Sequence, residues 1–307
     1  MKQAIIDLGT NTFNLLIGEI VDGKLCVAHS SKEAVMLGMG GITHNKIADD
    51  AMLRAKNTLL RFKEIANDHG VENIIGFGTS AMRGAENVEE ILNWAEYEQD
   101  LDVRVISGEV EAQLIYAGVR LLHPFDETGM IMDIGGGSNE FILADSSGVN
   151  EAQSFNIGVS RLYQMMGEPE VLTPEIRKKV DDFFERETDG FFNDKKVAHL
   201  IGASGSFETL YEMIYEERYP EKPEMIELPM YKVQGVINWS LSASLQERMD
   251  NPWIIPMRKR MLPFAAYSIL WVMKKLKTEK LSICPYSLKE GAFTIDLSWS
   301  RPGSGGD

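Results

Sequence analysis

The sequence is poor in cysteine, in histidine and in positive charge. Its 307 residues include 2 cysteines and 5 histidines, and 31 Lys and Arg residues are set against 46 Asp and Glu residues. Cys26 and Cys284 form no CxxC pair and have no histidine at metal-ligand spacing, which excludes a disulfide framework and a typical zinc site. The formal net charge of -15 argues against a binder of nucleic acid or anionic membranes, because the field of the protein repels them.

Long apolar runs are also missing. The longest one, Leu262 to Met273, is much shorter than the roughly 20 residues that cross a bilayer, and Pro263 interrupts it. It predicts a buried helix. Asp7 lies where a secretory signal would need an apolar core, so we expect a cytoplasmic protein.

Two common catalytic motifs are absent. No GxxxxGK[ST] segment occurs, which argues against a P-loop nucleotide site. Residues 202–206 resemble a nucleophile elbow, but Ser206 stands where the GxSxG pattern requires glycine. No ordered set of His and Asp partners follows this segment, so a hydrolase triad is not expected. An anionic ligand must therefore be bound by other local chemistry.

An internal repeat organises the chain. Residues 4–11 and 130–137 both read as an apolar strand that ends in Asp and a glycine turn, and they lie 126 residues apart. Residues 74–80 and 200–206 repeat a second strand and turn at the same spacing. The element order predicts an α/β protein made of two duplicated units. Ligands of such sheets gather at the carboxyl ends of the strands, so we expect the site in the cleft between the units.

Each half also predicts a long amphipathic helix. Apolar residues spaced for one helix face indicate a helix over Ile47–Asn67. In the second half the helix is expected over Pro174–Phe192, with Thr173 as its N-cap and Pro174 at its first position.

The domain boundary is expected where His123 and Pro124 break the preceding helix. We therefore predict a first domain over residues 1–122 and a second over residues 123–299. Residues 300–307, which are rich in glycine, are predicted to be a flexible tail.

The two glycine turns carry the residues suited to phosphate chemistry. Residues 7–12 and 133–140 each place glycine and a hydroxyl residue after a strand that ends in Asp. Glycine lets backbone N–H groups approach an anion closely. Side-chain donors are added by Thr10, Asn11 and Ser138. Asp7 and Asp133 would hold Mg²⁺ or position a water beside the phosphate. The alternative is a pair of tight hairpin turns with Asp as a local acceptor.

Five segments resemble the motif series of the Ppx/GppA phosphatase family in their order and spacing. They are DLGTNT at 7–12, GTSAMR at 78–83, ISGEVEA at 106–112, DIGGGSNE at 133–140 and LKEG at 288–291. That family consists of exopolyphosphatases and guanosine pentaphosphate phosphohydrolases. The resemblance implies two duplicated RNase H-like domains of the actin-like/sugar kinase/heat-shock ATPase fold, in the short two-domain form.

The resemblance also gives roles to two charged residues. Glu111 takes the position of the catalytic base, which orients or deprotonates the attacking water, with Glu109 as its nearest competitor. Without the family, either is a first-turn residue favoured by the helix dipole. Arg83 takes the position of a phosphate-binding arginine, and its alternative is a surface ion pair with Glu86 or Glu89.

The remaining site residues follow from the same resemblance. Glu140 is expected beside Asp7 and Asp133 as a residue that organises Mg²⁺ and water. The chain has Ser-Gly-Ser at 204–206 where a Gly-Gly-Thr-type turn is expected in the family. The predicted substrate-binding residues are Thr10, Asn11, Thr12, Arg83, Gly135, Gly136, Gly137, Ser138, Gly205 and Ser206.

One region departs from the overall acidity. Residues 251–280 contain seven basic residues and one acidic residue, Glu279. This basic strip consists of Arg258, Lys259, Arg260, Lys274, Lys275, Lys277 and Lys280. It predicts either a track for a polyphosphate chain or a solvated helix face beside a buried helix.

The resemblance thus implies a Mg²⁺-dependent phosphohydrolase that releases terminal phosphate from inorganic polyphosphate, from guanosine pentaphosphate, or from both. We expect neither nucleic acid nor a membrane as a partner. We expect the protein to form a homodimer. Two alternatives stay open: a small-molecule kinase of the same fold that uses ATP, and a polyphosphate or nucleotide sensor without turnover.

Overall fold

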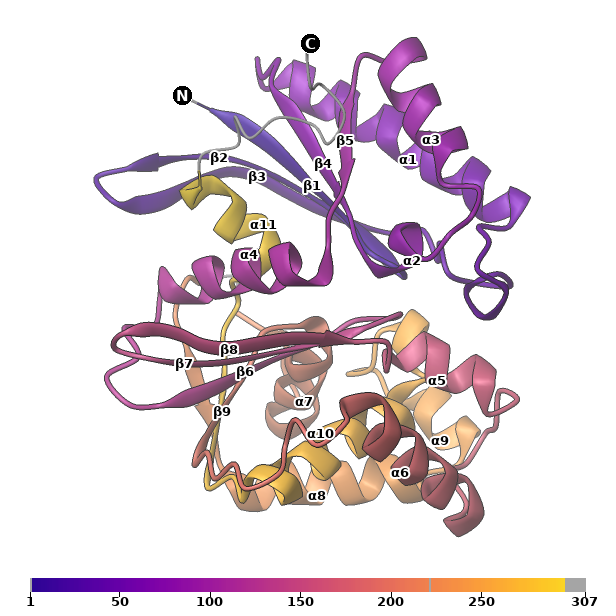
Figure 1. The fold of residues 1–307 in the computed structure, drawn as a ribbon, viewed down its shortest axis with the longest axis vertical. Coiled ribbons are helices and arrows are strands. Elements are labelled where there is room, and N and C mark those ends of the chain that lie inside the picture. Colours follow the sequence, from indigo (N-terminus) through magenta and orange to yellow (C-terminus); the bar gives the residue numbers. More distant parts are fainter. Residues whose placement is uncertain (1, 221, 296–307) are drawn as a thin grey trace. The chain divides into compact units, whose positions relative to one another are not determined.

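The protein forms two compact units in the computed structural model, which describes residues 2–220 and 222–295 (Figure 1). Unit 1 contains residues 2–121 and 287–295, and unit 2 contains residues 122–286. The chain therefore leaves unit 1, completes unit 2 and returns to unit 1.

This return differs from the predicted domains. The first boundary lies at residue 121, next to the expected 122. Residues 287–295, however, belong to unit 1 and not to the second domain predicted over 123–299. The predicted tail at 300–307 lies outside the described residues.

Unit 1 has a mixed five-stranded sheet in the order β3-β2-β1-β4-β5. Its strands are β1 (Gln3–Leu8), β2 (Thr12–Val21), β3 (Lys24–Ala34), β4 (Ile74–Gly78) and β5 (Asp102–Val105). Its helices are α1 (Asp49–Asp68), α2 (Ser80–Arg83), α3 (Glu89–Asn93), α4 (Gly108–Arg120) and α11 (Leu288–Gly291), with short turns of other helix types at Ile42–His44, Trp94–Glu98 and Ala292–Thr294. Strands β1, β4 and β5 are parallel, and β1, β2 and β3 pair antiparallel.

Unit 2 has a six-stranded sheet in the order β10-β11-β9-β6-β7-β8. Its strands are β6 (Gly129–Ile134), β7 (Asn139–Asp145), β8 (Gly148–Phe155), β9 (His199–Gly202), β10 (Ile226–Leu228) and β11 (Lys280–Ile283). Its helices are α5 (Val159–Met165), α6 (Pro174–Thr188), α7 (Gly205–Tyr215), α8 (Met230–Ser242), α9 (Leu245–Asp250) and α10 (Leu262–Leu276), with a short 3₁₀ turn at Pro256–Arg258.

The duplication is confirmed by strand order and by register. The order β8-β7-β6-β9-β11 repeats the order of unit 1, and β10 is an additional edge strand. Ile6 pairs with Gly76 in unit 1, and Met132 pairs with Gly202 in unit 2. Both members of the second pair lie 126 residues after those of the first, which is the spacing seen in the sequence.

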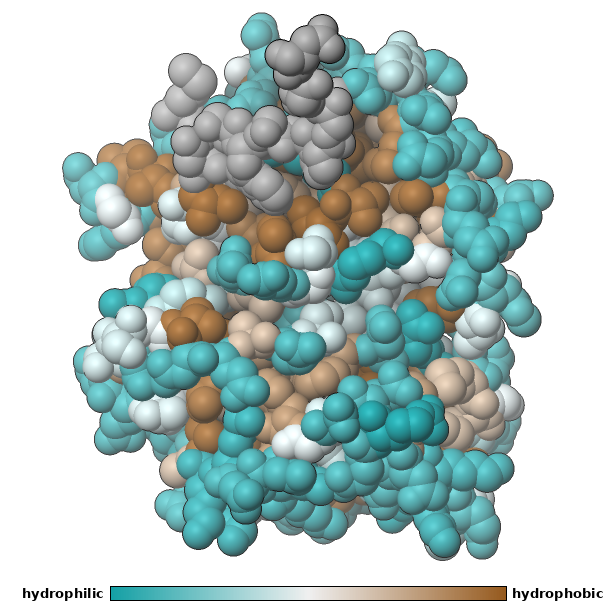
Figure 2. Space-filling view, in the orientation of Figure 1, coloured by the Kyte–Doolittle hydropathy of each residue, from teal (hydrophilic) through white to brown (hydrophobic). Residues whose placement is uncertain are grey.

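The predicted helices form where their capping and apolar patterns place them. The Thr173 side chain accepts a hydrogen bond of 3.3 Å from the Ile176 N–H and caps α6. The helix ends at Thr188, before the predicted Phe192, because Asp189 takes a left-handed conformation with φ of 40°. On the face shown in Figure 2, the surface over α6 and α8 is mainly hydrophilic. Helix α10 is largely buried, as its composition predicts.

No helix of the described residues is both long enough and apolar enough to span a membrane.

The returning segment packs tightly on α4. A Cβ atom added at Gly118 would lie 2.0 Å from the Ser287 carbonyl oxygen, and one at Gly291 would lie 1.8 Å from the Leu114 carbonyl oxygen. Only glycine permits such an approach of two backbones. These contacts hold the 288–291 motif inside unit 1.

Candidate active site

The first glycine turn connects β1 to β2 in unit 1. The Gly9 N–H donates to the Thr12 carbonyl oxygen at 3.0 Å, and a Cβ at Gly9 would lie 2.8 Å from that oxygen. The Asn11 carbonyl accepts from the Val35 and Met36 N–H groups at 3.0 and 2.9 Å, which fixes the turn to the end of β3. The predicted residues Thr10 and Asn11 lie in this short connection, and Thr12 is the first residue of β2.

Asp7 lies near the end of β1 and faces Asn14 across the β1–β2 ladder. The Asn14 side-chain amide donates to Asp7 Oδ2 at 3.0 Å. Burial raises the pKa of Asp7 to about 6, while the positive charge of Lys289 and the Asn14 hydrogen bond act in the opposite direction. Lys289 belongs to the returning segment, so this segment contributes charge to the turn.

Arg83 and Glu111 are brought together by two neighbouring parallel strands. Arg83 ends the helix that follows β4, and Glu111 lies in the first turn of the helix that follows β5. Arg83 Nη1 donates to Glu111 Oε2 at 2.9 Å and to the Ile106 carbonyl oxygen at 2.9 Å. Glu111 is only 7% exposed, whereas Glu109 is exposed. The partner of Arg83 is thus a buried carboxylate 28 residues away and not Glu86 or Glu89.

The second glycine turn, in unit 2, repeats the first. The Gly135 N–H donates to the Ser138 carbonyl oxygen at 3.0 Å, as Gly9 does to Thr12. The Ser138 hydroxyl in turn donates to Glu140 Oε1 at 2.6 Å, and the Ser154 hydroxyl donates to the same oxygen at 2.7 Å. Glu140 is 1% exposed, so its carboxylate is held rigidly beneath the turn.

Asp133 and Glu140 lie directly opposite each other on β6 and β7. Two like charges at facing positions of antiparallel strands repel each other, and a bound cation would relieve that repulsion. Mg²⁺ prefers oxygen ligands and is held by one or two carboxylates, with waters and substrate phosphates as its other ligands. Within the described residues no group of three or more His, Cys, Asp or Glu side chains is placed to hold a metal. The Asp133–Glu140 pair supplies two carboxylates, which is the number that Mg²⁺ needs from a protein when waters and phosphates are its other ligands.

A segment that the sequence analysis missed supports the second turn. Residues 158–161 donate their backbone N–H groups to the carbonyl oxygens of Gly135, Gly136 and Gly137. A Cβ at Gly158 would lie 2.5 Å from backbone atoms of Gly136 and Gly137. The only signal in the sequence is a glycine between a strand and a helix, which does not reveal its distant partner.

Gly205 and Ser206 begin α7, as the predicted turn requires, but an arginine covers the glycine. A Cβ at Gly205 would lie 1.6 Å from Arg258 Nη2. The guanidinium donates to the Thr209 hydroxyl at 2.9 Å and lies 3.6 Å from the Glu208 carboxylate. Burial lowers the pKa of Arg258, and the charge of Glu208 opposes that shift.

Three of the seven residues of the basic strip pair with separate acidic residues. Lys275 pairs with Glu185 at 2.5 Å, and Lys280 pairs with Glu227 at 3.1 Å. Arg258 points into α7, as described above. These local pairs favour the solvated helix face over a continuous track for polyphosphate.

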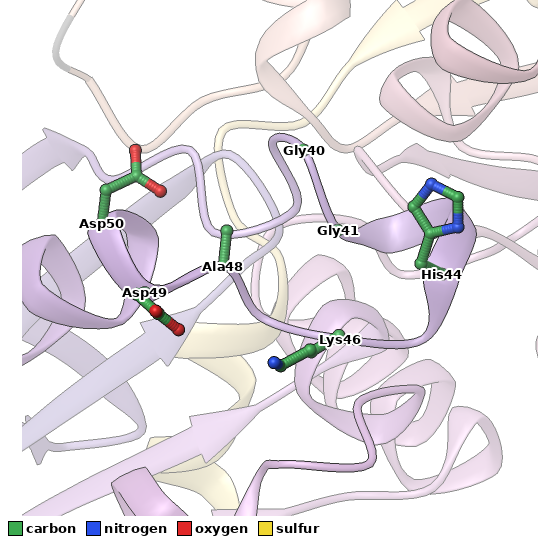
Figure 3. Close-up of a pocket in the computed structure, with 7 residues that line it drawn as sticks. All are labelled: Gly40, Gly41, His44, Lys46, Ala48, Asp49 and Asp50. Carbon is green, nitrogen blue, oxygen red and sulfur yellow. The ribbon is translucent and has the colours of Figure 1, made fainter.

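A cavity of about 570 Å³ lies at the start of α1 (Figure 3). Its lining residues are Gly40, Gly41, His44, Lys46, Ala48, Asp49 and Asp50. None of the predicted site residues lines it. The loop that carries it is nevertheless joined to the first turn, because the Gly38 N–H donates to the Thr10 carbonyl oxygen at 3.0 Å.

Comparison with known proteins identifies the family of this chain. A model of the Ppx/GppA phosphatase family matches residues 16–298. The chain belongs to the Ppx/GppA phosphatase family. A curated relative from Aeromonas hydrophila subsp. hydrophila, named guanosine-5'-triphosphate,3'-diphosphate pyrophosphatase, is 26% identical over 292 residues. The match covers 94% of this chain and 58% of that relative, so the chain spans little more than half the length of the relative.

Solved structures of Ppx/GppA proteins have the same fold. An exopolyphosphatase from Cytophaga hutchinsonii is 33% identical, with a TM-score of 0.90 over 96% of this chain and 97% of that one. The Aquifex aeolicus PPX-GPPA enzyme is 25% identical, with a TM-score of 0.81 over 96% of this chain and 99% of that one. Together with the repeated sheets, these matches confirm the two-domain actin-like fold.

Proposed function

We propose that this Ppx/GppA family member is a phosphohydrolase that releases terminal phosphate from inorganic polyphosphate or guanosine pentaphosphate. Relatives of this chain are named for these activities. In this chain the proposal depends mainly on the buried Glu111 carboxylate, whose Oε2 accepts a hydrogen bond of 2.9 Å from Arg83 Nη1. A carboxylate fixed beside a guanidinium places a proton acceptor next to a binding group for phosphoryl oxygen.

In the proposed reaction, water attacks the terminal phosphorus while the bond to the bridging oxygen breaks. Glu111 orients the water and takes its proton, and Arg83 neutralises charge on the phosphoryl oxygens. Positioning and charge neutralisation matter more than basicity in this chemistry, so a carboxylate suffices as the base.

The glycine turns bind the phosphate in this proposal. Amides of Gly136, Gly137 and Ser138 donate to phosphate oxygens, and the Thr10 to Thr12 turn offers donors of the same kind. Asp133 and Glu140, which face each other in unit 2, would hold Mg²⁺. When bound, the ion neutralises charge on the phosphate oxygens.

A parallel assay of phosphate release from long-chain polyphosphate, guanosine pentaphosphate and ATP, with Mg²⁺ and with EDTA, tests the proposal. Release from either of the first two substrates, lost in EDTA, is the expected result. Binding of both without release would favour the sensor. ATP consumption that depends on an added hydroxyl acceptor would favour the kinase.

A further inference from the structure

The three glycine carbonyl oxygens of the second glycine turn all accept hydrogen bonds from the start of α5. Four backbone N–H groups, those of residues 158–161, bond to the three carbonyl oxygens of residues 135–137. The bonds run from Val159 to Gly135 at 3.0 Å, from Ser160 and Arg161 to Gly136 at 2.8 and 3.1 Å, and from Gly158 to Gly137 at 3.2 Å. The carbonyl side of residues 135–137 is therefore fully hydrogen-bonded to the start of α5.

The planarity of the peptide bond then fixes the other side. In a trans peptide the N–H of one residue points opposite to the carbonyl of the residue before it. Holding the three glycine carbonyls therefore aims the N–H groups of Gly136, Gly137 and Ser138 away from α5. Successive N–H groups that point to one side form a cradle for an anion.

Arg161 adds a side-chain contact to this cradle. Its Nε donates to the Gly137 carbonyl oxygen at 3.1 Å, the same oxygen that accepts from Gly158. The side chain is partly buried, and burial lowers the pKa of Arg161 while the charge of Glu187 opposes that shift. A guanidinium stays charged even so, and its hydrogen bond to a carbonyl is of the stronger, charge-assisted kind.

The Gly137 carbonyl and the Ser138 N–H belong to one peptide group. A cation on the carbonyl oxygen draws electron density from that group, which makes the Ser138 N–H a stronger donor. Ser138 also carries the hydroxyl that donates to Glu140. Ser138 thus belongs to the anion cradle through its N–H and contacts Glu140 of the carboxylate pair through its hydroxyl.

We propose that Arg161 is a positioning residue for phosphate, which acts through the Gly137–Ser138 peptide. It orients and polarises the Ser138 N–H towards the terminal phosphate of the substrate. This inference rests on the proposed phosphohydrolase function for its kinetic consequence, but the effect on anion binding can be measured without turnover.

Arg161→Ala tests the inference, with Arg177→Ala as its matched control. Arg177 also lies in unit 2, and its Nε also donates to a main-chain carbonyl, that of Leu172 at 2.9 Å, away from the turn. We expect Arg161→Ala to lower kcat/KM for phosphate release by about 10- to 100-fold, on the scale of removing one anion donor. Guanidine at tens of millimolar should restore much of that loss. Arg177→Ala should keep its kcat/KM, and guanidine should not change it.

Binding of inorganic pyrophosphate, measured by calorimetry, gives the second readout and should weaken in Arg161→Ala alone. Equal kcat/KM and equal pyrophosphate binding in wild type and Arg161→Ala would overturn the inference. So would a loss of kcat/KM that guanidine does not restore, because the side chain would then only support the fold. A wild-type protein that releases no phosphate would instead refute the proposed function, and the comparison of pyrophosphate binding would still decide the role of Arg161.

Discussion

Asn14 and Glu140 occupy the same place in the two repeated sheets, and each faces an aspartate on the neighbouring strand. In unit 1 the side-chain amide of Asn14 donates a hydrogen bond to Asp7 at 3.0 Å. In unit 2 the facing residue of Asp133 is a second carboxylate. The duplicated frame thus carries two facing carboxylates in one copy and a carboxylate facing an amide in the other.

Glu140→Gln tests the assignment of Mg²⁺ to unit 2. The amide keeps the shape of the buried side chain but removes half of the negative pair. We expect the Mg²⁺ concentration for half-maximal phosphate release to rise about 10-fold or more, the usual scale for groups that tune a metal site. Glu151→Gln, an exposed residue on β8, serves as the control. An unchanged Mg²⁺ dependence in Glu140→Gln would contradict the assignment.

Glu111→Gln tests the proposed base. Turnover should fall by about 100-fold or more, because general-base catalysis contributes about 10²- to 10⁴-fold. The thermal transition, followed by circular dichroism, should stay cooperative, since Gln can still accept from Arg83. The exposed neighbour Glu109→Gln should release phosphate at the wild-type rate. Near-normal turnover in Glu111→Gln would remove this residue from the mechanism.

Arg248→Met tests a buried guanidinium in unit 2. Arg248 has no exposed surface and donates to the carbonyl oxygens of Lys259 and Arg260 at 2.9 and 3.1 Å, and also to that of Glu170. Methionine cannot replace these bonds, and each buried carbonyl left unpaired costs about 1–3 kcal/mol. Urea unfolding should show a loss of about 3 kcal/mol.

The exposed Arg186→Met provides the comparison for that variant. Its side chain is 66% exposed, pairs with the adjacent Glu187 and lies over the Phe183 ring. Its effect should stay within about 0.5 kcal/mol. Equal losses in the two variants would show that the contacts of Arg248 do not stabilise unit 2.

The lowered pKa of the buried His199 leads us to expect that stability depends on pH. Burial, helped by the nearby charges of Lys280 and His123 and opposed by Glu227, lowers the pKa of His199 to about 4 from the ordinary 6.5. Between these values the unfolded chain binds a proton that the folded chain does not, so stability falls as the pH falls from about 6.5 towards 4. In urea titrations across this range, His199→Gln should lose less stability than the wild type. Parallel curves for the two proteins would contradict the prediction.

Gly118→Ala tests the docking of the returning segment on α4. The added methyl group would collide with the Ser287 carbonyl 2.0 Å away, so we expect residues 287–295 to exchange amide hydrogen faster. Gly235→Ala in α8 is the matched control, because no atom lies within 4 Å of its added Cβ. That change should be neutral or should stabilise the helix by up to about 1 kcal/mol. Unchanged exchange at 287–295 in Gly118→Ala would count against tight docking.

Features encoded in short segments could be predicted from the sequence. The two glycine turns and the capped helix at Thr173 depend on neighbouring residues, and the repeat of 126 residues is visible because such short segments recur; the structure shows all three. Arg83 and Glu111 could be singled out only by resemblance to a family. Their contact depends on β4 and β5 lying side by side, which sequence spacing does not reveal.

Contacts between distant segments escaped prediction for the same reason. Residues 158–161 show no periodicity that ties them to the glycine turn, and their role is visible only in the hydrogen bonds to residues 135–137. The return of residues 287–295 to unit 1 likewise depends on two glycines that fit between backbones. A glycine in a sequence can indicate that another segment packs closely against it, but the sequence does not show which segment that is.

The return of the chain to unit 1 has a consequence for biosynthesis. Residues 122–286 form unit 2 as one uninterrupted stretch, whereas unit 1 needs residues 287–295 to cover α4. During translation the later-encoded unit can therefore complete its contacts first, while α4 waits with an uncovered face. Unit 1 is thus the first to be synthesised and the last to be completed, and that face of α4 stays uncovered in the nascent chain until residues 287–295 have been made.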